Sequence, residues 1–70
     1  MKAFIDLIGY DENNEQIAIL VKIDKIAYVR EVLNDEQVGA VIQFDNGQSA
    51  AVYESYGEIV DLIKETEING

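Results

Sequence analysis

The chain contains no cysteine, no histidine, no proline and no tryptophan. Without cysteine there can be no disulfide, zinc–thiolate site, thiol nucleophile or iron–sulfur cluster. Without histidine there is no Ser-His-Asp or Cys-His pair and no imidazole ligand for a metal. These absences leave few routes to catalysis, so we expect a protein that is not an enzyme and uses no cofactor.

Basic residues are also scarce, with 5 Lys and Arg against 14 Asp and Glu and a formal net charge of −9. The basic residues are dispersed along the chain and form no run: Lys2, Lys22, Lys25, Arg30 and Lys64. Proteins that bind nucleic acid neutralise phosphates with Lys and Arg, so we expect no direct contact with nucleic acid or with an anionic membrane. The charge instead favours a basic protein surface as partner, or serves solubility alone.

Long hydrophobic runs are missing too, and the longest clear one covers only residues 17–21. A membrane span needs about 20 apolar residues, and the few that follow Lys2 do not make a signal peptide. We therefore expect a cytoplasmic protein. Hydrophobic residues still make up 49% of the 70 residues, which indicates one folded domain over residues 1–70 rather than a disordered acidic tail.

Alternation of apolar and polar residues predicts five strands joined by short polar connections. The expected strands span residues 3–8, 17–23, 26 to 32 or 33, 38–44, and 48 or 49 to 53. A bend is expected at residues 24–25 and a four-residue polar connection at residues 34–37. Asn46 and Gly47 suit the positive φ angles of a type I′ turn, which predicts a hairpin there.

A helix is expected at the C-terminus, where Ser55 and Glu58 fit the capping box Ser-x-x-Glu. An apolar stripe follows at helical spacing, widened by Leu62: Tyr56, Ile59, Val60 and Ile63. Gly57 is interpreted as a packing glycine. The predicted fold is α+β, a small antiparallel five-stranded sheet or barrel in the order β-β-β-β-β-α.

Several expected strands carry apolar residues on both faces, which one helix cannot cover. Either the sheet curls into a compact monomeric barrel, or one face or edge pairs with another chain. A domain of this size is marginally stable alone, and a large apolar patch marks an interface. We expect a homo-oligomer.

Acidic residues cluster in two expected loops, Asp11–Glu12 and Asp35–Glu36. The first loop lacks the ligand spacing of a calcium-binding EF-hand, so we expect no metal site. Carboxylates in exposed turns would both ionise, whereas glycosidase chemistry needs two whose pKa values differ. Both clusters are interpreted as solvated turns.

The candidate partner-binding residues lie at the last strand and the helix. An acidic ridge is expected there, formed at near-helical spacing by Glu54, Glu58, Asp61 and Glu65. The alternative interpretation is that these residues are simply the solvated side of an amphipathic helix. Tyr53 and Tyr56 flank the strand–helix junction and suit a protein contact. Spaced carboxylates can imitate a phosphate backbone, which suggests an inhibitor-like module of the DNA-mimic or phage counter-defence type that covers a basic surface of a nucleic-acid-handling protein.

A second hypothesis is a homo-oligomer that sequesters a small nucleotide between subunits. In this hypothesis the nucleotide is held by Tyr53, Tyr56 and Arg30. The hypothesis predicts a stable oligomer that carries its ligand.

The chain also resembles a known family over about two thirds of its length. The resemblance lies in three segments, residues 23–29 (IDKIAYV), 40–47 (AVIQFDNG) and 52–60 (VYES and EIV). They are similar to the small flagellar-associated FlbD/SwrD family and to the C-terminal part of LytTR DNA-binding domains. The resemblance implies a β-rich topology and, as a third hypothesis, a flagellar or other assembly accessory protein; it carries over no functional residue. Asp24 and Lys25 stand where the flagellar family has Asn-Pro.

Overall fold

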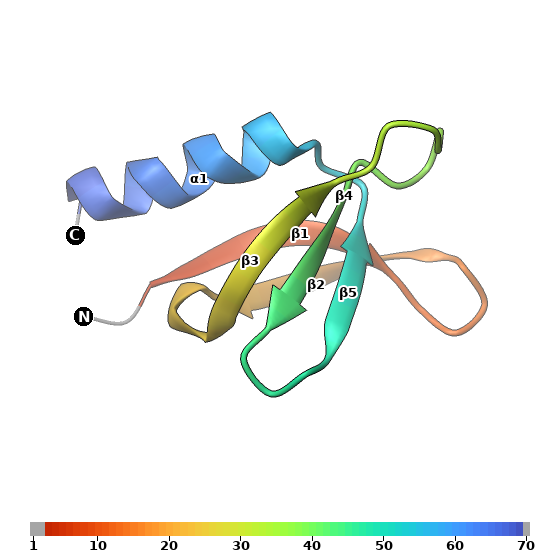
Figure 1. Ribbon diagram of the computed structural model, residues 1–70, viewed down its shortest axis with the longest axis horizontal. Coiled ribbons are helices and arrows are strands. Elements are labelled where there is room, and N and C mark those ends of the chain that lie inside the picture. Colours follow the sequence, from red (N-terminus) through yellow and green to blue (C-terminus); the bar gives the residue numbers. More distant parts are fainter. Residues whose placement is uncertain (1–2, 70) are drawn as a thin grey trace.

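The computed structural model describes residues 3–69 and contains five strands and one C-terminal α-helix (Figure 1). The strands are β1 (Phe4–Tyr10), β2 (Gln16–Lys22), β3 (Ile26–Glu31), β4 (Ala40–Phe44) and β5 (Ser49–Val52), and the helix is α1 (Tyr56–Asn69). All strand pairs are antiparallel. The predicted α+β fold and its element order are confirmed. Within the described chain, no helix has the length and apolar character needed to cross a membrane.

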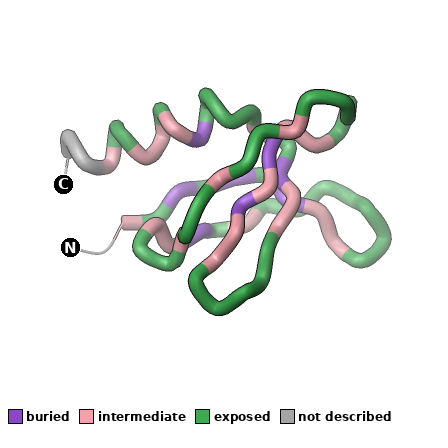
Figure 2. Tube along the Cα trace, in the orientation of Figure 1, coloured by how far each residue is buried: buried purple, intermediate pink, exposed green. Residues whose placement is uncertain are grey.

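The core lies on one face of the sheet, where alternate strand residues point inward. In β1, Ile5 and Leu7 are buried while Phe4 and Ile8 are exposed, which is the period-2 pattern of a half-buried strand. The buried hydrophobic residues come from four strands and the helix: Ile5, Leu7, Val21, Ala40, Ile42, Val52 and Ile59. Figure 2 shows these buried positions on the strands and near the start of α1, while the hairpin loops are mostly exposed.

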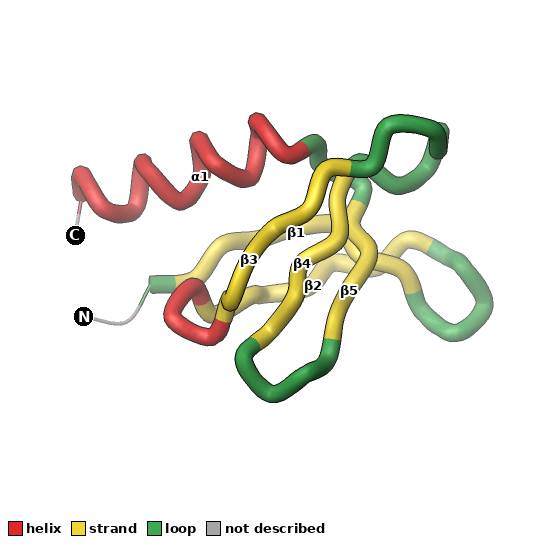
Figure 3. The backbone as a smooth tube through the Cα atoms, viewed as in Figure 1, coloured by secondary structure: helices red, strands yellow, loops and turns green. Residues whose placement is uncertain are grey.

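The sheet is curled, because its two edge strands are joined by one short turn. The strand order is β2-β1-β5-β4-β3, and the 3-10 helix η1 (Ile23–Lys25) links the edges β2 and β3 (Figure 3). Strands spaced about 4.8 Å apart would separate the edges of a flat five-stranded sheet by about 19 Å. The four residue steps from Lys22 to Ile26 span at most about 14 Å. The sheet must therefore curl, which is closer to the barrel than to the flat sheet of the two arrangements predicted from the sequence.

Helix α1 lies across the curled sheet and packs against β1 and β3 (Figure 1). Ile59 is fully buried, and Leu62 and Ile63 pack against the core beside it. The predicted apolar stripe is therefore only partly right: Val60 is half-buried, and Tyr56 is 44% exposed. The buried face is centred on Ile59, Leu62 and Ile63 because the curled sheet meets the helix on that side.

The hairpin between β4 and β5 is not the predicted type I′ turn. Gly47 has φ 89°, but Asn46 is not among the residues with positive φ. Gly47 N–H donates to Phe44 O at 3.2 Å, which closes a turn around Asp45 and Asn46. This is a three-residue loop, a type I turn followed by a left-handed glycine. The hairpin prediction is right, but Gly47 is the third residue of the loop rather than the second, and Asn46 does not need a positive φ.

The connection between β3 and β4 is longer than predicted, because β3 ends at Glu31 and β4 begins at Ala40. The turn is organised by Asp35, whose Oδ1 accepts hydrogen bonds from Gln37 N–H at 2.8 Å and Val38 N–H at 3.1 Å. A side chain that bonds the backbone two and three residues on competes with strand pairing. Val38 is therefore part of this turn, although its apolar side chain suggested a strand.

The loop between β1 and β2 is a polar turn, as predicted. Oδ1 of Asp11 accepts hydrogen bonds from Asn13 N–H at 2.8 Å and Glu15 N–H at 3.0 Å, and Asn14 adopts φ 62°. These local bonds explain why this acidic segment folds into a tight turn.

Candidate functional site

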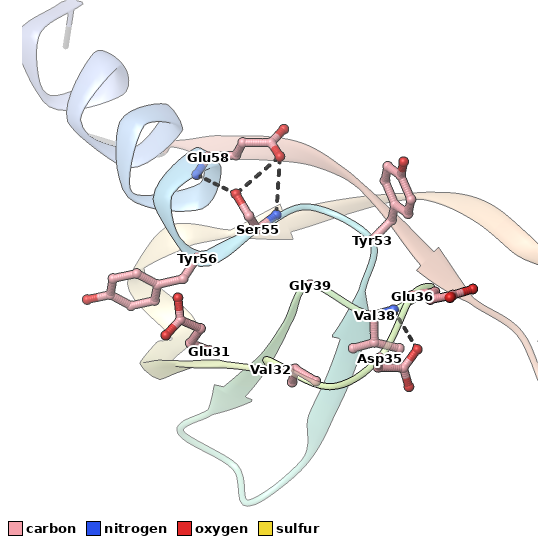
Figure 4. A pocket seen from close by; sticks show the side chains of 10 residues that line it. All are labelled: Glu31, Val32, Asp35, Glu36, Val38, Gly39, Tyr53, Ser55, Tyr56 and Glu58. Carbon is pink, nitrogen blue, oxygen red and sulfur yellow. Dashed lines mark hydrogen bonds between the residues drawn. The ribbon is translucent and has the colours of Figure 1, made fainter.

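The start of α1 is fixed by the predicted capping box (Figure 4). Ser55 Oγ accepts a hydrogen bond from Glu58 N–H at 3.2 Å. Glu58 Oε1 in turn accepts from Ser55 N–H at 3.3 Å and from the Ser55 hydroxyl at 3.1 Å. The box satisfies two backbone donors that a helix start would otherwise leave free. It also holds the Glu58 carboxylate at the junction between β5 and α1.

A hollow of about 260 Å³ opens between this junction and the β3–β4 connection (Figure 4). Its lining residues come from the end of β3, the connection after it, the β5–α1 junction and the start of α1: Glu31, Val32, Asp35, Glu36, Val38, Gly39, Tyr53, Ser55, Tyr56 and Glu58. Four of these described lining residues are acidic and none is basic. We call this hollow the acidic pocket.

Gly39 brings the two walls of the acidic pocket together. Its N–H donates to Val52 O at 2.9 Å, and its O accepts from Val32 N–H at 3.1 Å. A Cβ at this position would lie 2.5 Å from Glu54 O and 2.6 Å from Tyr53 O, so the backbones meet too closely for any side chain. The β3–β4 connection can therefore pass under the β5–α1 junction only because residue 39 is glycine.

The four carboxylates of the acidic pocket differ in what they do for the fold. Asp35 and Glu58 each use an oxygen to cap local backbone groups. For Glu31 and Glu36, no side-chain hydrogen bond or ion pair is found within residues 3–69. Both residues are exposed. Their charges are thus available to a partner.

The two tyrosines predicted for the site both line the acidic pocket. Tyr53 is 51% exposed and Tyr56 is 44% exposed, so both side chains are accessible to a partner. A third tyrosine supports the pocket from outside, since the Tyr10 hydroxyl donates a hydrogen bond to Gln37 O in the β3–β4 connection. Aromatic faces beside carboxylates suit the recognition of cationic groups.

The predicted acidic ridge continues from the pocket along α1. Glu58, Asp61 and Glu65 are all exposed, and at about 100° per residue they fall within an arc of about 60°. Seven residues of helix cover about 10 Å. Three carboxylates over that length lie about 5 Å apart along the helix axis, whereas the phosphates of one B-DNA strand rise about 3.4 Å each, so the ridge is a row of negative charges with a somewhat wider axial spacing.

Glu54 does not belong to this ridge, although the sequence placed it there. It precedes the helix, and its two carboxylate oxygens lie 2.9 and 3.0 Å from Ile8 N, whose N–H donates to them. The pairing of β1 with β5 ends at this point. Gly9 lies opposite Val52, and the next backbone bond, from Tyr53 N–H to Ile8 O, is the last one between the two segments. The Glu54 side chain therefore replaces the missing strand partner, and its role is in the fold.

Replacing Glu54 with Ala is expected to lower the free energy of unfolding by about 1 to 2 kcal/mol, because Ile8 N–H loses a charged acceptor. Glu54→Gln keeps an acceptor oxygen and should cost less. Glu12→Ala, in the exposed β1–β2 loop, removes the same charge and serves as the control in urea denaturation. Equal stability of the Glu54→Ala and Glu12→Ala variants would show that the Ile8 bond contributes nothing.

Arg30 does not line the acidic pocket together with Tyr53 and Tyr56 of the same chain. It is exposed on β3, and the residue of β3 that lines the acidic pocket is its neighbour Glu31. Successive strand side chains point to opposite faces, so Glu31 and Arg30 lie on different sides of the sheet. A nucleotide phosphate at Tyr53 and Tyr56 would meet carboxylates instead of the arginine.

Sequence reasoning missed part of the acidic pocket and misread one glycine. Glu31, Val32, Val38 and Gly39 line the pocket, yet nothing in their local pattern points to the β5–α1 junction. Gly57 is not a packing glycine, because a Cβ there would meet nothing within 4 Å. The one usable signal is the alternation of side chains along β3, which places Glu31 on the face of the sheet opposite to Arg30.

The residues described by the structure include no group of three or more Asp or Glu side chains arranged to hold a metal ion. No family model, curated protein or solved structure matches the chain. The resemblance to the FlbD/SwrD and LytTR families therefore stays a prediction, and the case for a function depends on the geometry of the site.

Proposed function

We propose that the protein is a non-catalytic cytoplasmic binding module that docks on a basic protein surface through the acidic pocket and the ridge on α1. The observation that carries this proposal is the lining of the pocket, which combines four carboxylates and two half-exposed tyrosines with no basic residue. A lysine or arginine side chain of the partner would enter the pocket, where the carboxylates attract it and the tyrosine faces stack on it.

The ridge extends this surface. Glu58, Asp61 and Glu65 add a row of negative charges along α1, about 5 Å apart along the helix axis against about 3.4 Å for the phosphates of one DNA strand. Basic grooves that handle nucleic acid are built to receive such a row, so we propose an inhibitor-like role in which the module covers a groove of this kind. The net charge of −9 steers the encounter and makes it fast and sensitive to salt.

The proposal is tested by titrating the protein with a hexa-arginine peptide in a calorimeter. Glu31→Gln with Glu36→Gln removes two pocket charges that the fold does not use. Each exposed ion pair contributes about 0.2 to 1 kcal/mol, so the loss of two pairs should weaken binding about twofold to thirtyfold. Raising the salt should also weaken binding of the unmodified protein.

The matched control is Glu12→Gln with Glu15→Gln, which removes two charges from the β1–β2 loop. This variant has the same net charge as the pocket variant and should bind the peptide almost as well as the unmodified protein. Equal weakening in both double variants would mean that the peptide senses only net charge, and would contradict the pocket as a site.

A further inference from the structure

The edge of the sheet at β2 (Gln16–Lys22) has few of the features that usually keep an edge strand from pairing with another chain, and its one charged residue, Lys22, stands at the end of the strand. It contains no proline, no carboxylate and no register shift against β1. Most of it is exposed, including Ile17 at 41% and Leu20 at 63%. Within residues 3–69, β1 is the one strand that pairs with it.

The opposite edge, β3 (Ile26–Glu31), is also mostly exposed but differs in its register and its charge. Its pairing with β4 shifts register between Ile26 and Tyr28, and it carries the exposed charges of Arg30 and Glu31. Bulges and charges on edge strands prevent unwanted pairing. The contrast between the two edges therefore marks β2 as the edge left open.

The backbone groups on the open edge can be identified from the pairing with β1. Ile23 N–H donates to Ala3 O, so odd-numbered residues of β2 bond to β1 in this register. The N–H and C=O groups of Ala18 and Leu20 consequently point away from β1. The other side of β1 agrees with this assignment. Ile8 is the residue opposite Ala18, and its C=O accepts from Tyr53 N–H after β5, so neither Ile8 nor Ala18 uses its backbone groups for the β1–β2 pairing.

We propose that a second copy of the chain occupies this edge, with the two β2 strands pairing antiparallel about a two-fold axis at Ile19. This register aligns all seven residues and places Ala18 and Leu20 opposite each other in hydrogen-bonded pairs. Ile17 then faces Val21 of the second copy, and Lys22 faces Gln16. Apolar residues meet apolar residues, and no like charges are directly opposed.

Charge also allows a second copy to approach at this place. The chain carries −9 overall, yet the seven residues of β2 include one lysine and no acid. Two copies can meet here without bringing carboxylates of the strand face to face. Pairing would also cover Leu20 and extend the apolar outer face that Phe4 and Ile8, 43% and 36% exposed, form on β1. This inference does not depend on the proposed function.

The test is sedimentation velocity of the purified protein at concentrations from about 1 to about 500 µM, a range that covers micromolar dissociation constants. We expect a monomer–dimer equilibrium that tightens with salt, since screening reduces the repulsion between two negative chains. Binding to a basic partner weakens with salt, so the two associations are distinguishable. A protein that stays monomeric over the whole range would overturn the inference.

Two variants locate the interface. Leu20→Lys puts a charge into the pairing face and should weaken the dimer about tenfold or more. Leu33→Lys makes the same change at a leucine that is 78% exposed in the β3–β4 connection, and should leave the dimer intact. If both variants are monomeric, or if both still form the dimer, the interface does not lie at β2.

Ala18→Pro removes one outward N–H while leaving every β1–β2 hydrogen bond in place, since those use odd-numbered residues of β2. It should abolish the dimer with an unchanged circular dichroism spectrum. Hydrogen exchange gives a check that needs no variant: the amides of Ala18 and Leu20 should become protected as concentration rises. Exchange at these amides that is independent of concentration in a dimeric sample would exclude β2 pairing.

Discussion

Replacing Gly39 with Ala is expected to destabilise the protein more than any other single-methyl change in the chain. The new Cβ would lie 2.5 Å from Glu54 O and 2.6 Å from Tyr53 O, both backbone atoms that cannot rotate away. Relief would require the β3–β4 connection to separate from the β5–α1 junction and break the bond from Gly39 N–H to Val52 O. We expect a loss of about 3 kcal/mol or more.

A loss of this size matters for a small domain, because 70 residues support roughly 4 to 10 kcal/mol of stability. The measurement is urea denaturation followed by circular dichroism. Gly57→Ala is the matched control, since the same substitution in α1 meets nothing within 4 Å and should stabilise the helix by about 0.5 to 1 kcal/mol. If Gly39→Ala proves as stable as Gly57→Ala, the two walls of the acidic pocket do not touch as described.

Replacing Ile59 with Ala is expected to have the second largest effect, a loss of about 2 to 5 kcal/mol. Ile59 is fully buried and is the residue through which α1 enters the core. Its truncation leaves a cavity that the curled sheet can close only in part. Because the ridge and two lining residues of the acidic pocket, Tyr56 and Glu58, belong to α1, this contact also positions the proposed binding surface.

Val60→Ala is the control for Ile59→Ala, because Val60 is the next residue on the same helix and is half-buried. Alanine favours the helix at both positions, so the difference between the two variants in thermal or urea unfolding isolates the core contact. A cost at Ile59 no greater than that at Val60 would mean that α1 is not docked on the sheet through this side chain.

The parts of the fold that local sequence determines were predictable. Alternation gave the five strands, and Ser55 with Glu58 gave the helix start, because each depends on residues within one turn or one strand. The turn at Gly47 was predicted as a hairpin with the wrong turn type. Asn-Gly is compatible with both the type I′ turn and the three-residue loop, and strand register decides between them.

The parts that depend on distant residues were not predictable. Glu54 was assigned to the ridge by spacing, but its carboxylate binds Ile8, 46 positions away in sequence. Gly39 carried no local signal, since the carbonyls that exclude a side chain there belong to Tyr53 and Glu54. The acidic pocket exists because the sheet curls and brings these segments together, which no periodicity reveals.

The most direct test of the proposed function is a map of where a cationic probe binds. The measurement is a ¹H–¹⁵N correlation spectrum of the labelled protein during titration with hexa-arginine. We predict that the shifts concentrate on the acidic pocket and the exposed face of α1, including the amides of Gly39 and Glu58, and that salt reverses them. The amides of the loop from Asp11 to Glu15 should move little. Shifts spread evenly over all acidic segments, or strongest in that loop, would contradict the pocket as the binding site.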